Sequence, residues 1–146
     1  MRYLGLDLGE RSLGVALSDT TCLIASSYKT IFYDGDYEKV ITELKPIIEE
    51  FEIKKIVLGY PKNMNNSVGD RALKTEEFKE LLESAFFLEV ILVDERLTTK
   101  EATNYMLEAD ISRKKRKKKV DSLAATIILQ TYLDMEEKHE WRENNI

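Results

Sequence analysis

Three acidic residues stand in surroundings that suit a metal-dependent reaction. Asp7 interrupts the apolar stretch 2–8, Glu95 follows Asp94 at the end of another apolar stretch, and Asp121 lies at the start of a helical pattern. A carboxylate inside a core strand costs free energy unless it is paired or binds a cation. Carboxylates that converge also repel one another, and a divalent cation with oxygen ligands, such as magnesium, removes that repulsion. Together the three acids therefore indicate a site at which bound metal ions could activate water against a phosphodiester.

Each of these acids also has an ordinary structural explanation. Backbone groups or Arg11 could satisfy Asp7, and Arg96 could pair with Glu95. Asp121 could simply favour the first turn of its helix, where a negative charge is stabilised. The case for chemistry therefore depends on the three acids as a set, and on the expectation that the strand preceding Glu95 ends where open α/β sheets place their ligands.

A dense basic segment lies directly before Asp121. It consists of seven consecutive cations, Arg113, Lys114, Lys115, Arg116, Lys117, Lys118 and Lys119. The whole chain has a formal net charge of −5, so it offers one local place for a polyanion and no general affinity for polyanions. We interpret the segment as a loop that neutralises a phosphate backbone, with Arg11 and Arg96 holding further phosphates. The alternative is a solvated loop kept mobile by the repulsion of its own charges.

Composition limits the class of protein. The 146 residues, of which 43% are hydrophobic and 34% charged, suit one soluble domain with a full-sized core. With one cysteine and one histidine, the chain alone can form neither a disulfide nor a Cys/His zinc site. No apolar run is long enough to cross a membrane and no signal peptide is evident, so we expect a cytoplasmic protein without a membrane partner. We expect residues 1–138 to form a single domain and residues 139–146 to be a frayed tail.

The hydrophobic pattern predicts the elements that must position these residues. Strands are expected at about residues 2–8, 12–19, 25–32, 55–60 and 87–93. Helices are expected from Asp36, with Pro46 inside it, from about residue 70, from the capping box at Thr98, and from near Val120. Short turns join the first three strands, which favours an antiparallel meander, and the later helix crossovers favour parallel strands. The expected fold is α/β, a five-stranded mixed sheet with helices on both faces.

Four spaced motifs resemble the YqgF-type family over residues 1 to about 133. They are Gly5-Leu-Asp7-Leu-Gly9-x-Arg11-x-x-Gly14-Val-Ala16, Gly59-Tyr-Pro-Lys-Asn-Met64, Asp94-Glu-Arg-Leu-Thr-Thr99 and Ser112-Arg-x-Lys-Arg-Lys-Lys-x-x-Asp121-x-x-Ala-Ala125. The family comprises bacterial Holliday-junction resolvase-like proteins that are also described as pre-16S rRNA nucleases. The resemblance implies a ribonuclease H-like fold, with Asp7, Glu95 and Asp121 as the catalytic, metal-binding acids. Asn66 departs from the family, whose loop usually has glycine there; asparagine tolerates a left-handed backbone, so we expect the loop shape to survive.

The resemblance implies a hydrolase, a nuclease that depends on Mg²⁺ or Mn²⁺ and acts on structured nucleic acid. The expected reaction is 5′-end processing of precursor 16S rRNA in ribosome biogenesis, with the pre-ribosomal particle as a possible partner. The alternative substrate is branched DNA, a Holliday junction cut during recombination or repair. The chain could act as a monomer or as a homodimer, and a junction resolvase should be a symmetric dimer.

Two hypotheses from other classes compete with the nuclease. Actin-like ATPases and sugar kinases also carry Asp-x-Gly in a first β-hairpin, but they need two such domains and 146 residues supply one. A ribosome-maturation factor that binds nucleic acid without cutting it would gain nothing from converging carboxylates. Both hypotheses are therefore weaker than the nuclease.

Overall fold

The computed structural model describes residues 1–61, 69–94 and 113–144, and for 113–122 and 139–144 it describes the backbone alone. The elements in chain order are β1 (Arg2–Leu8), β2 (Ser12–Ser18), β3 (Ala25–Phe32), α1 (Tyr37–Glu50), β4 (Ile53–Tyr60), α2 (Asp70–Phe86), β5 (Glu89–Asp94) and α4 (Arg113–Asn144). The helix expected from Thr98 lies outside the described residues, as do Glu95, Arg96 and Asn66.

The five strands form one mixed sheet in the order β3-β2-β1-β4-β5. β1, β2 and β3 are antiparallel neighbours, whereas β4 lies parallel to β1 and β5 parallel to β4. This is the predicted topology: tight turns join the antiparallel strands, and helical crossovers join the parallel ones. β1 is the central strand, so the carboxyl ends of β1, β4 and β5 meet at one edge of the sheet.

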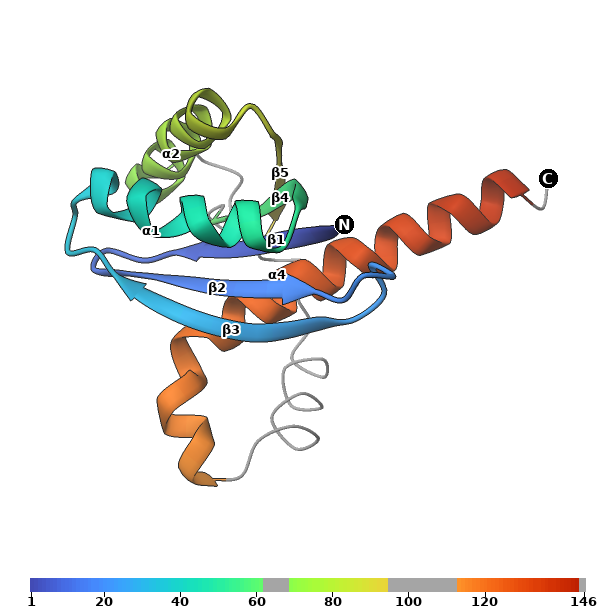
Figure 1. Ribbon diagram of the computed structural model, residues 1–146, viewed down its shortest axis with the longest axis horizontal. Helices are drawn as coiled ribbons and strands as arrows, with labels where there is room; N and C mark the ends of the chain where they lie inside the picture. Colours follow the sequence, from blue (N-terminus) through green and yellow to red (C-terminus); the bar gives the residue numbers. More distant parts are fainter. Residues whose placement is uncertain (62–68, 95–112, 145–146) are drawn as a thin grey trace.

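Helices cover both faces of the sheet, as predicted (Figure 1). Leu4, Leu6 and Leu8 point to the face covered by α1 and α2, where they join the larger hydrophobic core. Tyr3 points to the opposite face, where α4 packs through Ala125, Ile128, Leu129 and Leu133. The alternation of side chains along β1 therefore divides the protein into a larger core on one side and a smaller core under α4.

Helix α1 begins and continues as the sequence indicates. The Asp36 carboxylate caps it by accepting a hydrogen bond from the Glu38 backbone N–H at 3.1 Å. Val40, Leu44 and Ile47 recur at helical spacing and are buried. Pro46 lies inside the helix, where it lacks a backbone donor but does not end the element.

Three predicted boundaries are wrong, the first of them the start of β4, which is at Ile53 instead of residue 55. The strand expected at 87–93 begins at Glu89, because Phe87 ends α2 in a left-handed conformation with φ 55°. The basic segment 113–119 is not a loop: its backbone is helical, and α4 begins at Arg113 instead of near Val120. Lysine and arginine are good helix formers, and no glycine or proline interrupts residues 113–144, so charge repulsion does not prevent the helix.

At the other end α4 is helical to Asn144, which includes most of the expected tail; the domain boundary at residue 138 stays a prediction. Within the part of the chain that the structure describes, no helix combines the length and the apolar character needed to span a membrane.

Candidate functional site

Asp7 lies near the carboxyl end of the central strand with glycine on both neighbouring strands. Across β2, Asp7 is directly opposite Gly14. On the other side Gly59 follows Leu58, which is the partner of Leu6. The Asp7 side chain is partly exposed, whereas both glycines are buried. Because glycine has no side chain, the space beside the Asp7 carboxylate is not filled by the two flanking strands.

The space over Gly5, by contrast, belongs to a helix. A β-carbon added at Gly5 would lie 2.6 Å from Leu129 Cβ and 3.0 Å from the Ala125 carbonyl oxygen, both on α4. A glycine in a strand lets a ligand or another backbone come close. At Gly5 the occupant is the backbone of α4, so this glycine positions the helix and does not bind a ligand.

The way α4 crosses β1 determines which part of the helix approaches Asp7. The Tyr3 hydroxyl donates to Glu136, whereas Gly5 contacts Ala125 and Leu129, so the helix runs antiparallel to the strand. Asp7 is two residues, about 6.6 Å, farther along β1 than Gly5. An equal distance along the helix is somewhat more than one turn, toward its start. Asp121, one turn before Ala125, is on that turn of the backbone; its side chain is not among those described.

For Glu95, the third predicted acid, the structure describes only the strand that precedes it in the chain. β5 pairs in parallel with β4, with Gly59 opposite Val93 and Tyr60 opposite Asp94. Val93 packs on the α4 face of the sheet, the face to which the odd-numbered residues of β1 point. Glu95 follows Asp94 but lies outside the described residues. β5, which ends one residue before Glu95, thus ends at the same edge of the sheet as β1.

Among the residues whose side chains are described, no three acids, histidines or cysteines gather into a group that could hold a metal ion. That result does not cover Glu95 and Asp121, two of the three predicted ligands, because their side chains are not described.

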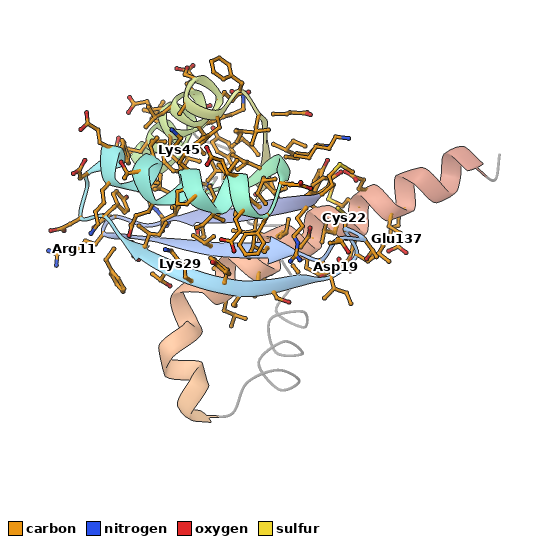
Figure 2. All side chains as sticks on the ribbon, viewed as in Figure 1. Arg11, Asp19, Cys22, Lys29, Lys45 and Glu137 are labelled. Atoms are coloured by element: carbon orange, nitrogen blue, oxygen red, sulfur yellow. The ribbon has the colours of Figure 1, made fainter. Side chains whose placement is uncertain are left out.

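Arg11, a predicted phosphate ligand, lies in the β1–β2 turn, where its Nε is 3.9 Å from Asp34 Oδ1. Both side chains are more than 80% exposed, so this ion pair contributes little to stability. Figure 2 shows Arg11 at one end of the sheet, with Asp19 and Cys22 at the other.

A polar network that the sequence analysis did not identify holds the second half of α4 on the sheet. Lys55 of β4 donates to the Tyr132 hydroxyl at 3.0 Å, and its Nζ is 3.5 Å from a Glu136 oxygen. The Tyr3 hydroxyl donates to the other Glu136 oxygen at 2.8 Å. The Lys55 ammonium also lies 5.2 Å from the Tyr3 ring centroid and 5.5 Å from that of Tyr132. These residues are far apart in sequence, so no local pattern could have revealed them.

The network shifts the pKa of its members. Burial alone would raise the pKa of Glu136, but hydrogen bonds from Tyr132 and Tyr3 and the charge of Lys55 lower it below its ordinary value. Burial and the hydrogen bond to Glu136 raise the pKa of Tyr3 to about 12. The network therefore holds a carboxylate in its charged form beneath the helix.

The basic segment forms the first turns of α4, and Figure 1 shows these turns, in orange, extending away from the sheet. They lie directly before the part of the helix that approaches Asp7. The predicted phosphate ligands from Arg113 to Lys119 are thus on a helix next to the candidate site; their side chains are not among those described.

Comparisons with known proteins identify close relatives. The model of the RuvX family, with the description Holliday junction resolvase, matches residues 1–135. A protein from Desulfitobacterium hafniense named "Putative pre-16S rRNA nuclease" is 52% identical over 134 residues, which cover 92% of each chain. One of the same name from a Geobacillus species is 51% identical and covers 92% of this chain and 98% of its own.

Solved structures resemble the fold at much lower sequence identity. Thermus thermophilus RuvC has a TM-score of 0.61 at 13% identity and covers 93% of this chain and 97% of its own. The fowlpox virus resolvase in complex with Holliday junction DNA has the same TM-score at 14% identity, covering 93% and 99%. These similarities confirm the expected ribonuclease H-like fold. With relatives near 50% identity along almost its whole length, the chain belongs to the RuvX family, the YqgF-type family that its motifs resemble.

Proposed function

We propose that this protein is a divalent-metal-dependent nuclease whose catalytic acids are Asp7, Glu95 and Asp121. The observation that carries the proposal is the placement of Asp7, a carboxylate on the central strand with Gly14 and Gly59 on the strands beside it. Because both positions are glycine, no side chain of β2 or β4 lies directly beside the Asp7 carboxylate, which suits a metal ion and a substrate phosphate. Relatives about half identical in sequence carry nuclease names, which supports the same class of reaction.

The residues present suit Mg²⁺ or Mn²⁺. Asp7 supplies a hard oxygen ligand, and the glycines beside it leave room for water and for a substrate phosphate, which such ions retain as ligands. Glu95 and Asp121 would complete the set of ligands, because β5 ends at the same edge as β1 and the turn of α4 before Ala125, which includes Asp121, approaches that edge. When bound, the metal would lower the pKa of a coordinated water and stabilise the departing oxygen of the phosphodiester.

The remaining tasks fall to the residues of the chain. Asp7 on β1, Asp121 on α4 and Glu95, which follows β5 in the chain, would together present the scissile phosphate to water in one orientation. Cations of the segment 113–119, together with Arg11 and Arg96, hold neighbouring phosphates. The charge pattern fits this division of labour, because the cations flank an acidic centre that would repel the substrate without them.

The substrate we propose is the 5′ end of precursor 16S rRNA, within a pre-ribosomal particle in the cytoplasm. The names of the relatives favour it, since they specify pre-16S rRNA. A four-way DNA junction is the second candidate, favoured by the description of the family model. A junction cut symmetrically would require two copies of the chain, whereas RNA trimming could be done by one.

Cleavage of the two substrates side by side tests the proposal. Labelled precursor 16S RNA and a labelled four-way DNA junction are incubated with the wild type in Mg²⁺, in Mn²⁺ and without metal. Asp7→Asn, Glu95→Gln and Asp121→Asn are compared with Glu137→Gln, a control that removes a carboxylate from an exposed position on α4. We expect metal-dependent cutting by the wild type and the control, and loss of at least about 100-fold in each of the three variants, as when a group acting in the transition state is removed. Binding of nucleic acid without cutting in either metal would instead indicate a non-catalytic maturation factor.

A further inference from the structure

A cleft of about 800 Å³ opens beside the candidate site, between the β1–β2 turn and the first turns of α2. Its wall includes Leu8 and Gly9 at the end of β1, the stacked rings of Tyr33 and Tyr37, and charged residues from both sides. Asp7, the only one of the three predicted catalytic acids whose side chain is described, does not line it. The cleft therefore lies apart from the Asp7 carboxylate, although Leu8, the next residue of β1, is part of its wall.

The cleft and the proposed catalytic centre include neighbouring residues of β1. Leu8 follows Asp7 directly, but its side chain points to the α1 and α2 face of the sheet. Asp7 lies on the alternate face, under α4, because side chains alternate along the strand. The two sites therefore lie on either side of one edge of the sheet. A nucleic acid strand with a phosphate at Asp7 could pass over this edge and enter the cleft.

The charges on the wall are mixed. Arg71 and Lys74 are three residues apart on the exposed face of α2, and Arg11 faces them from the turn. Three carboxylates share the wall, those of Glu10, Asp34 and Asp70. A surface for the outside of a duplex carries mostly cations. Cations and carboxylates together fit a whole nucleotide, because the cations can bind its phosphate while the carboxylates accept hydrogen bonds from base amino groups.

The aromatic part of the wall is held rigidly. The Tyr33 and Tyr37 rings stack with centroids 5.7 Å apart, and Tyr37 packs on the buried ring of Phe78. The Tyr33 hydroxyl donates a hydrogen bond to the Gly9 carbonyl, which fixes the β1–β2 turn at the mouth of the cleft. Of the two rings, Tyr37 is the partly exposed one, so it is the surface available to a base.

We propose that this cleft binds one unpaired nucleotide of the strand being cut, next to the scissile phosphate, with Arg71 and Lys74 as its phosphate ligands. The proposal rests on the proposed nuclease function and adds to it a requirement on the substrate. A nucleotide that leaves the α4 face and enters the cleft cannot stay stacked in a regular duplex. The protein should therefore select single-stranded segments or strand branches over fully paired helices.

The test compares two double variants that remove the same charge. Arg71→Ala/Lys74→Ala removes two cations from the cleft, and Lys29→Ala/Lys45→Ala removes two exposed cations on β3 and α1, outside it (Figure 2). Binding of a labelled single-stranded RNA oligonucleotide, and of a fully paired RNA duplex of the same length, is measured across a salt series without metal. Thermal unfolding of both variants confirms that they are folded.

We expect the cleft variant to bind the single strand about tenfold more weakly. The slope of its salt dependence should be shallower by about 0.7 for each phosphate that the cleft no longer neutralises. Its duplex binding should match that of the control variant. A single 4-thiouridine beside the scissile position should also cross-link to Tyr37 or to residues 70–74. Equal weakening in the two variants, or cross-links confined to other parts of the chain, would overturn the proposal.

Because binding is measured without metal, the result for the cleft does not depend on whether cleavage is found. If the wild type cuts its substrate and the cleft variant binds and cuts as the control does, this inference fails while the nuclease function stands. If the wild type cuts nothing with any metal, the proposed function fails. The cleft proposal is then decided by whether the cleft variant, and not the control variant, loses binding to the single strand.

Discussion

Gly5 of the central strand and Leu129 of α4 are so close that a β-carbon on Gly5 would lie 2.6 Å from the Leu129 β-carbon. Real β-carbons do not approach that closely, so any larger residue at position 5 must displace the helix. The same strand carries Asp7 two residues later, and the same helix carries Asp121 two turns before Leu129. The contact between Gly5 and Leu129 therefore fixes the strand that carries Asp7 against the helix that carries Asp121.

We expect Gly5→Ala to impair stability and cleavage together. The added methyl group should lower the free energy of unfolding by about 1–3 kcal/mol, the usual cost of overpacking a core. Because α4 must move, cleavage should fall by a larger factor than the loss of folded protein explains. Urea unfolding and cleavage rates of Gly5→Ala and Gly5→Val should show costs that rise with side-chain size. If the wild type, Gly5→Ala and Gly5→Val were equally stable and equally active, α4 would not lie where the structure places it.

The network beneath α4 predicts a dependence of stability on pH. The pKa of Glu136 is lower in the folded protein than its ordinary value, so its carboxylate stabilises the fold above that ordinary value, near 4.5. That stabilisation is lost as the pH falls through the lowered pKa. Glu136→Gln should therefore unfold more easily at pH 7, and the difference from wild type should shrink in acid.

Glu137→Gln serves as the matched control, because it removes the next carboxylate along α4, an exposed one that takes no part in the network. Chemical denaturation at several pH values provides the measurement. A Glu136→Gln protein whose stability tracks the wild type at every pH would contradict the role of the network.

The end of α2 offers a stabilising substitution. Phe87 closes the helix in the left-handed region, with φ 55° and ψ 37°, and its ring is 90% exposed. Glycine adopts this conformation without the penalty of a β-carbon, which outweighs its greater freedom in the unfolded chain. We expect Phe87→Gly to raise the free energy of unfolding by up to about 1 kcal/mol, or the Tm by about 3 °C. Phe87→Ala removes the same ring but keeps the β-carbon, so its free energy of unfolding should not rise comparably. Equal increases in the two variants would show that loss of the exposed ring, and not relief of the backbone, causes the effect.

Sequence reasoning succeeded where the pattern is local. Asp36 predicted the start of α1, and the short turns predicted the antiparallel pairing of β1, β2 and β3. It failed at Phe87, because an unbroken apolar run from Phe86 to Leu88 does not show where the helix stops and the strand begins. It also failed for the basic segment 113–119, where the helix propensity of lysine and arginine prevails over charge repulsion.

Features made by distant parts of the chain were beyond the reach of the sequence. Nothing near Lys55 indicates that it meets Glu136, since the contact exists only once α4 has crossed the sheet. The same holds for the cleft, whose two sides come from the β1–β2 turn and from α2. For the candidate site, the sequence supplied the acids and the expected edge of the sheet, and the crossing of α4 at Gly5 came from the structure.

Metal binding should stabilise the wild type through Asp7. A ligand that binds only the folded state adds about 2.7 kcal/mol of stability at a concentration of about 100 times its Kd. We therefore expect Mn²⁺ to raise the Tm of the wild type and of Glu137→Gln in a concentration-dependent way, and to leave Asp7→Asn unchanged. Calcium and magnesium titrations alongside would show which ion the site prefers. An equal shift in Asp7→Asn would place the metal at another site.

Metal-directed cleavage of the protein itself tests the central claim most directly. Fe²⁺, loaded in place of Mg²⁺ and supplied with ascorbate and peroxide, generates hydroxyl radicals that cut the chain close to the ion, and the new termini are identified by mass spectrometry. The account predicts three clusters of cuts, around residues 7, 95 and 121, which excess Mg²⁺ suppresses and Asp7→Asn abolishes. Cuts confined to other segments, or the same three clusters in Asp7→Asn, would contradict it.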